Sequence, residues 1–120
     1  MDKLDTIFEM QQALDEDITT RRHLTHITAE EWIQKDVLAI IAELGELLNE
    51  VNFKWWKNPK EIQTAALHEE MVDVLHFFVS MCIRAGMDAD TLYRIYMDKN
   101  KENFNRQHGL SSKPGYAVED

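Results

Sequence analysis

The sequence predicts an all-α protein, and three observations carry that prediction. Only four glycines and two prolines interrupt the 120 residues. No run of Val, Ile and Thr suggests a strand. Apolar residues make up 44% of the chain and recur at spacings of three and four. We therefore expect four amphipathic helices in a compact bundle, and a single domain that covers residues 1–120.

The first helix is expected over about residues 3–18. Its apolar stripe consists of Leu4, Ile7, Phe8, Leu14 and Ile18. Gln11 falls inside this stripe, where a lone glutamine is commonly a satisfied core amide. An amide also carries both a donor and an acceptor, so Gln11 could instead read the edge of a nucleobase in an apolar pocket.

The second and third helices are marked by capping signals. Thr28 and Glu31 stand at capping-box spacing and open a helix that runs to about Val51. The third helix is expected to begin at Asn58-Pro59, an N-cap followed by proline at the first helical position. Gly86 is placed to end it in a left-handed conformation.

The fourth helix opens the last third of the chain. Asp88 or Asp90 is expected to cap it, and it runs to about Gln107. The tail, residues 109–120, has no helical period and contains Ser, Pro and Gly, so we expect it to be extended or flexible.

Two pairs of carboxylates interrupt apolar runs in the second and third helices. Glu43 and Glu46 are three residues apart, as are Glu70 and Asp73, so each pair shares a helix face, about 60° apart. Side by side, the two helices would bring four carboxylates together, and a divalent cation would stabilise that cluster. Oxygen ligands without a thiolate favour Mg²⁺, with Mn²⁺ as a substitute.

Two other interpretations of the acidic pairs stay open. Most pairs of glutamates on helices form a solvated face, although these pairs lie within apolar runs. A di-iron or di-manganese bundle uses Glu-x-x-His, and Asp73-x-x-His76 resembles half of that motif. Glu43-x-x-Glu46 lacks the histidine, which disfavours this interpretation.

Aromatic and basic residues add two candidate substrate contacts. Trp56 lies in a loop with Phe53, Trp55 and lysines, where rings can stack on a base or simply cover the end of the bundle. Three residues of the fourth helix share one face that suits phosphate oxygens or is simply solvated: Lys99, Asn103 and Arg106.

The net charge and the cysteine content limit which binding partners and which compartment we expect. Thirteen Lys and Arg against 22 Asp and Glu give a net charge of -9, which argues against binding of long nucleic acids. Cys82 is the single cysteine and cannot form an internal disulfide, so we expect a cytoplasmic protein. No signal peptide or membrane span is expected. A chain of this length buries only about two-thirds of its unfolded surface, which favours a homodimer or tetramer.

Glu43-x-x-Glu46 followed by Glu70-x-x-Asp73 resembles the metal-binding signature of the all-α nucleoside triphosphate pyrophosphohydrolases, the superfamily of MazG-like enzymes. The closer resemblance is to the dimeric all-α dUTPases and the related phage dCTPase-dUTPase. It extends over residues 10–15, 53–58, 70–77 and 99–107.

The resemblance implies a Mg²⁺-dependent enzyme that converts dUTP and water to dUMP and pyrophosphate. It implies that Glu43, Glu46, Glu70 and Asp73 hold the metal, and we favour Glu46 as the group that activates water. It further implies that Gln11, Trp56 and His76 shape the base pocket, and that Lys99, Asn103 and Arg106 meet the phosphates. The alternatives are dCTP or a broader set of nucleotides as substrates, and, from another class, a non-catalytic helical oligomerisation module.

Overall fold

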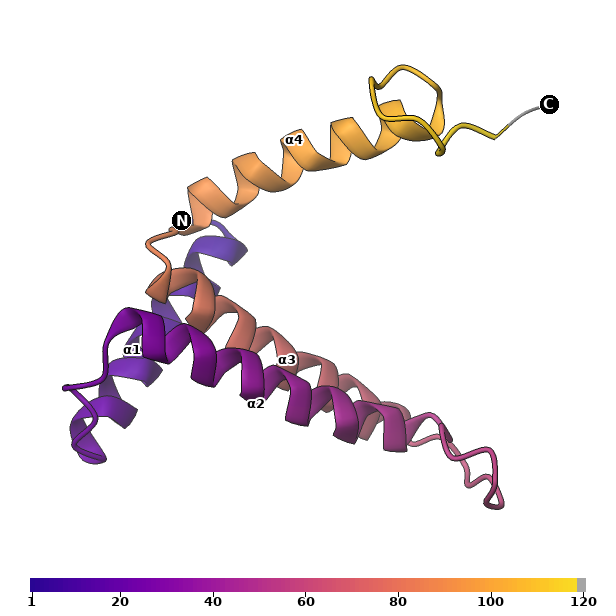
Figure 1. Ribbon diagram of the computed structural model, residues 1–120. Helices are drawn as coiled ribbons and strands as arrows, with labels where there is room; N and C mark the ends of the chain where they lie inside the picture. Colours follow the sequence, from indigo (N-terminus) through magenta and orange to yellow (C-terminus); the bar gives the residue numbers. More distant parts are fainter. Residues whose placement is uncertain (119–120) are drawn as a thin grey trace. The chain divides into compact units, whose positions relative to one another are not determined.

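The computed structural model describes residues 1–118 and contains four helices (Figure 1). They are α1 (Lys3–Arg21), α2 (Ala29–Glu50), α3 (Thr64–Arg84) and α4 (Ala89–Gln107). Residues 1–118 contain no strand, so the all-α, four-helix prediction is confirmed. Over the same residues, no helix is long and apolar enough to cross a membrane.

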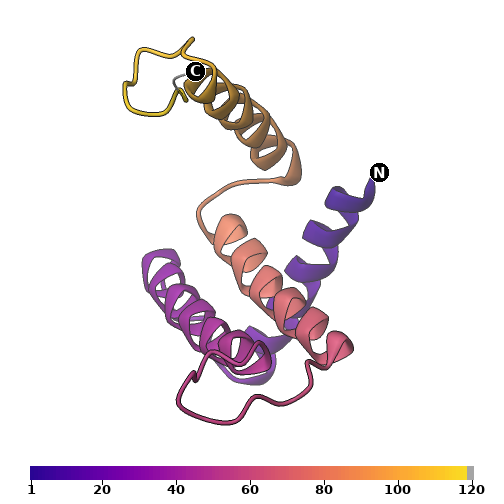
Figure 2. The ribbon, with the colours of Figure 1, turned by 90° about the vertical axis from the view of Figure 1, so that its right-hand side faces the viewer.

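The chain divides into two compact units, Met1–Gly86 and Met87–Asp120. In the first unit, α2 and α3 run side by side in opposite directions, and α1 packs against α3 (Figures 1 and 2). The second unit consists of α4 and the irregular segment that follows it. The expectation of a single domain over residues 1–120 stays a prediction.

Side-chain caps fix the starts of three helices. The Asp2 carboxylate accepts a hydrogen bond from the backbone N–H of Asp5 at 2.9 Å and begins α1. Thr28 Oγ1 accepts from the Glu31 N–H at 3.2 Å, and Asp88 Oδ1 accepts from the Thr91 N–H at 2.8 Å. Each cap satisfies an N–H group that has no partner within its own helix. The predicted starts of α2 and α4 agree with these positions.

The predicted start of α3 is wrong. The helix begins at Thr64 rather than at Asn58-Pro59, and residues 51–63 form a connection without helical structure (Figure 2). Asn52, in a left-handed conformation with φ 57°, bonds both backbone groups of Lys60 at 2.9 Å each. Because the Lys60 N–H and C=O are bonded to the Asn52 side chain, they cannot form the backbone hydrogen bonds of a helix in this segment.

The end of α3 follows the prediction. Gly86 adopts φ +86°, and its N–H donates to the carbonyl of Ile83 at 3.0 Å. A left-handed residue after the last turn allows the chain to leave the helix while pairing a terminal carbonyl.

The tail after α4 has no regular secondary structure up to Val118, and residues 119–120 of the predicted tail lie outside the described residues. It returns to the end of α4. The Ser111 hydroxyl donates to Glu102 at 2.6 Å, and the guanidinium of Arg106 lies 5.3 Å from the centre of the Tyr116 ring. Up to Val118, the tail therefore has specific contacts with α4.

The fully buried residues of the first unit include as many polar as apolar side chains. Phe8, Val79 and Cys82 form its apolar centre, while Gln11, Asp36 and Ser80 are the buried polar residues. A buried polar side chain is costly unless it is hydrogen-bonded. The polar side chains buried between α1, α2 and α3 therefore mark a candidate binding site.

Candidate active site

Three of the four predicted carboxylates converge between α2 and α3. Glu43, Glu46 and Glu70 each place one carboxylate oxygen so that all three oxygens lie within 4.8 Å of one another. Residues three apart share a helix face, and the antiparallel pairing brings the face of α2 against that of α3. This spacing allows one cation to contact all three carboxylates.

The electrostatics of this cluster are unfavourable without a counter-ion. Burial, together with the neighbouring carboxyls of Glu43 and Glu46, raises the pKa of Glu70 to about 7. One oxygen each of Glu43 and Glu70 is buried and has no hydrogen-bond partner. Buried, unpaired carboxylate oxygens are the donors that Mg²⁺ and Mn²⁺ bind, so the residues present fit such an ion.

Asp73 lies one turn beyond Glu70 on α3 and is not part of this close group. It lines the adjoining cavity, which has a volume of about 450 Å³. Glu43 of the carboxylate cluster lines the same cavity. The remaining polar lining comes from Gln11, Asp15, Thr19, Asp36, His76, Ser80 and Arg84. The cavity therefore extends from the carboxylates along the groove between α1, α2 and α3.

Gln11 and His76, predicted to shape a base pocket, meet in this cavity. His76 Nδ1 lies 2.6 Å from Gln11 Oε1, and Gln11 Nε2 donates to Asp15 Oδ1 at 2.9 Å. Only 6% of Gln11 is exposed. The amide is thus a fixed polar group in the wall of the cavity, and fixed polar groups are what set ligand orientation in binding pockets.

A second polar group occupies the inner end of the cavity. Asp36 is 5% exposed, and its Oδ2 atom is buried without a partner. Burial and the charge of Asp15 raise the pKa of Asp36 to about 6, against the opposing effects of Arg84 and Ser80. The guanidinium of Arg84 lies 4.7 Å from the centre of the Trp32 ring, and its Nε has no partner.

Trp56 does not line the cavity that contains Gln11 and His76. It lies in the connection between α2 and α3, is 58% exposed, and makes edge-to-face contacts with Phe53 and Trp55. Phe53 and the lysines of this connection line a separate hollow of about 280 Å³. The predicted role of Trp56 in base binding stays a prediction.

The predicted phosphate contacts lie on α4, in the second unit. Lys99 and Asn103 are exposed. The Arg106 guanidinium is engaged within the unit, where its Nε donates to Glu102 at 3.1 Å. Ser111 and Arg106 together hold the pKa of Glu102 below its usual range, as expected for a carboxylate that accepts two hydrogen bonds.

The inner residues of the cavity were not predicted from the sequence: Asp15, Asp36, Ser80 and Arg84. A signal for two of them exists in the spacing. Asp36 precedes Glu43 by seven residues, and Ser80 follows Asp73 by seven, which is about two helical turns on the same face. Polar residues two turns away on the same helix face as each acidic pair are therefore a sequence signal for Asp36 and Ser80.

Comparison with known proteins gives the family. A family model described as dUTPase matches residues 3–88. A dCTP pyrophosphatase of Enterobacteria phage T4 is 45% identical over 38 residues, which is 32% of this chain and 22% of that protein. A dCTP pyrophosphatase of Enterobacteria phage LZ5 is 33% identical over 64 residues, 44% of this chain and 37% of that protein.

These alignments span well under half the length of the two curated phage relatives. No solved structure shows significant similarity to the chain. The matched region of the family model contains α1, α2 and α3, and with them the converging carboxylates and the cavity. The chain belongs to the dUTPase family, on the branch of the all-α nucleoside triphosphate pyrophosphohydrolases that includes the phage dCTP pyrophosphatases.

Proposed function

We propose that the protein is a Mg²⁺-dependent pyrophosphohydrolase of pyrimidine deoxynucleoside triphosphates. The observation that carries this proposal is the convergence of Glu43, Glu46 and Glu70 beside a cavity that holds a buried amide. The family description names dUTP as the substrate, whereas the two phage relatives are named for dCTP. The resemblance described above implies dUTP, with dCTP as the alternative.

The three carboxylates, with Asp73 beside them, would hold the cation. When bound, Mg²⁺ supplies positive charge to the phosphate oxygens and lowers the pKa of a coordinated water. Mn²⁺ would fit the same oxygen ligands. Among residues 1–118 the sequence offers no Gly-rich phosphate-binding loop, so cationic help must come from the ion and from basic side chains.

Glu46 is the proposed general base. Its carboxylate is exposed, whereas those of Glu43 and Glu70 are partly buried, so Glu46 is the most accessible to a water molecule. It would accept a proton from that water as the new bond between oxygen and phosphorus forms and a phosphoanhydride bond breaks. The products are a nucleoside monophosphate and pyrophosphate.

Release of pyrophosphate from a panel of nucleotides tests this function. We expect turnover of pyrimidine deoxynucleoside triphosphates with Mg²⁺ and a loss on the order of 10²-fold or more in kcat for Glu46→Gln. Glu30→Gln, an exposed substitution in the first turn of α2, is the matched control and should retain activity. Failure of the Mg²⁺-loaded protein to hydrolyse any nucleotide would contradict the proposal and favour a non-catalytic module.

We also propose that the protein acts as a homodimer. Several large apolar side chains of α2 and α3 are exposed in the single chain, including Leu38 at 66% and Ile41 at 59%. An apolar hollow of about 330 Å³ lies beside Gln11 and is lined by Ile7, Met10, Val72 and Leu75. Exposed apolar surface on this scale is typical of a face that a partner covers. Sedimentation equilibrium would distinguish a dimer from a tetramer, and a monomer would contradict this proposal.

A further inference from the structure

The segment after α4 turns back and closes on itself. Two glycines in left-handed conformations turn the chain: Gly109, two residues after α4, has φ +71°, and Gly115, directly before Tyr116, has φ +93°. The two ends of the segment meet, because a Cβ added at Gly109 would lie 3.5 Å from the Cβ of Ala117. We call residues 109–117 the clamp, a defined loop within the second unit.

The clamp encloses the side chain of Arg106. The Arg106 guanidinium lies 5.3 Å from the centre of the Tyr116 ring, and its Nε donates to Glu102 Oε1 at 3.1 Å. The Ser111 hydroxyl donates to the same Glu102 oxygen at 2.6 Å, so the clamp also holds the carboxylate that holds Arg106. Only 15% of the Arg106 side chain is exposed.

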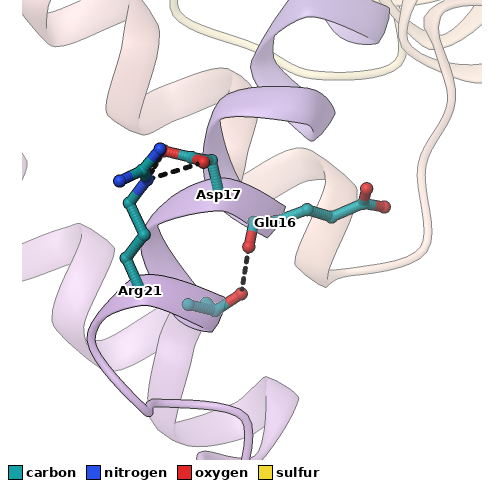
Figure 3. Close-up of polar contacts among 4 residues, drawn as sticks. Glu16, Asp17 and Arg21 are labelled. Atoms are coloured by element: carbon teal, nitrogen blue, oxygen red, sulfur yellow. Dashed lines mark hydrogen bonds and ion pairs between the residues drawn. The ribbon is translucent and has the colours of Figure 1, made fainter.

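A second arginine shows that an ion pair alone does not enclose a guanidinium. Arg21 and Asp17 on α1 are also four residues apart, and Arg21 Nε donates to the Asp17 carboxylate at 2.9 Å (Figure 3). The Arg21 side chain is nevertheless 77% exposed, compared with 15% for Arg106. The clamp, which Arg21 lacks, accounts for the difference.

The enclosed guanidinium keeps the groups that bind phosphate. It carries five N–H groups, and its hydrogen bonding to residues 1–118 uses only the one on Nε. The two Nη atoms of Arg106 therefore remain as a planar fork, which suits bidentate binding of phosphate oxygens. A long side chain loses conformational entropy when a ligand fixes it, and this loss is smaller when the protein has fixed the side chain beforehand.

We propose that Glu102 and Tyr116 are positioning residues, which act through Arg106 by holding its guanidinium ready for the phosphate oxygens of the nucleotide. This inference rests on the proposed function and on the phosphate contact that the resemblance implies for Arg106. It makes the ring of Tyr116, and not its hydroxyl, the group that acts, because a guanidinium is attracted to the face of an aromatic ring.

The experiment measures KM and kcat separately for the nucleotide that is hydrolysed fastest. We expect Tyr116→Ala to raise KM on the order of tenfold and to change kcat less, because the loosened arginine serves binding. Tyr116→Phe keeps the ring and should retain the KM of the wild-type protein. In an Arg106→Gln background, Tyr116→Ala should raise KM no further, since a residue that acts only through another has no effect once the other is removed.

Glu102→Ala and Asp17→Ala form a matched pair. Each removes the carboxylate that accepts a hydrogen bond from an arginine Nε four residues away, but the clamp holds only one of the two arginines. Glu102→Ala should raise KM in the same direction as Tyr116→Ala, and Asp17→Ala should leave it unaltered. An equal rise in both variants would show that a lost surface charge, and not the clamp, affects binding.

Three results would overturn the inference and leave the pyrophosphohydrolase proposal standing. The first is an unchanged KM in Tyr116→Ala. The second is an equal loss in Tyr116→Phe, which would place the hydroxyl on the substrate. The third is a further rise when Tyr116→Ala is added to Arg106→Gln, which is the result that fraying of α4 alone would give.

Calorimetric titration with pyrophosphate and Mg²⁺ separates this inference from the function on which it rests. If no nucleotide is hydrolysed, the proposed function fails, but pyrophosphate still offers the phosphate oxygens that Arg106 would bind. Weaker binding to Tyr116→Ala than to the wild-type protein and Tyr116→Phe supports the inference. Equal binding to all three, or no binding to any of them, overturns it.

Discussion

Asp36→Asn should stabilise the protein, because it removes a buried charge that the fold does not compensate. Asp36 is 5% exposed, and its Oδ2 atom has no partner. Burial is the main cause of its raised pKa, and the charge of Asp15 adds to it. Arg84 and Ser80 act in the opposite direction, and the resulting pKa of about 6, compared with 3.8, already includes their effect.

The magnitude follows from this shift. A folded-state pKa about two units above its ordinary value corresponds to a penalty of at most about 3 kcal/mol when Asp36 is ionised. Because the pKa is raised, the penalty is absent well below pH 3.8, grows between about pH 3.8 and pH 6, and is complete above that. The partner-less amide of the variant offsets part of the gain, so we expect about 1–3 kcal/mol at about pH 8.

Urea unfolding at fixed protein concentration, at about pH 8 and at about pH 4, measures the effect. The gain should fall below about 1 kcal/mol at the lower pH, where Asp36 is protonated in the wild-type protein. Asp17→Asn controls for loss of a carboxylate at the surface and should change stability by about 0.5 kcal/mol or less. An equal gain at both pH values, or a loss at pH 8, would refute the reasoning.

Three further predictions concern helices and metal. Gly45→Ala in α2, where an added Cβ meets no atom within 4 Å, should stabilise by roughly 0.5–1 kcal/mol in urea unfolding, whereas Gly86→Ala at φ +86° should destabilise by about 1 kcal/mol. Asp88→Ala should reduce the helical signal of α4 and cost about 1 kcal/mol. Addition of Mg²⁺ should raise the melting temperature of the wild-type protein more than that of Glu46→Gln, and a chelator should reverse the rise; equal shifts would exclude Glu46 as a ligand.

Local signals predicted most of the fold. The caps at Thr28 and Asp88 and the left-handed Gly86 each act within a few residues, so their effects can be read from the chain. The start of α3 could not be predicted in this way. Asn52 and Lys60 are eight residues apart, and their hydrogen bonds compete with the capping signal of Asn58-Pro59 only once the connection has folded.

The candidate site also contains some residues that local sequence signals predict and others that depend on how the helices pack. Glu43, Glu46 and Glu70 were predictable because like charges within apolar runs are conspicuous. Asp15 and Ser80 were not, because isolated polar residues on a helix usually face solvent, and only the packing of α1 against α3 brings the two together. The position of Trp56, which does not line the cavity, likewise depends on the conformation of residues 51–63.

Asp36 and Glu43 are seven positions apart on α2, which places the two ends of the cavity about 10 Å apart. Under the proposed function, a change at the Gln11 end of the cavity can therefore leave the cluster of Glu43, Glu46 and Glu70 untouched. In evolutionary terms, the proposed chemistry and the proposed choice of nucleotide would then vary independently on this scaffold. A drift between uracil and cytosine would then require few substitutions in α1 and α3, consistent with a family in which relatives carry names for either nucleotide.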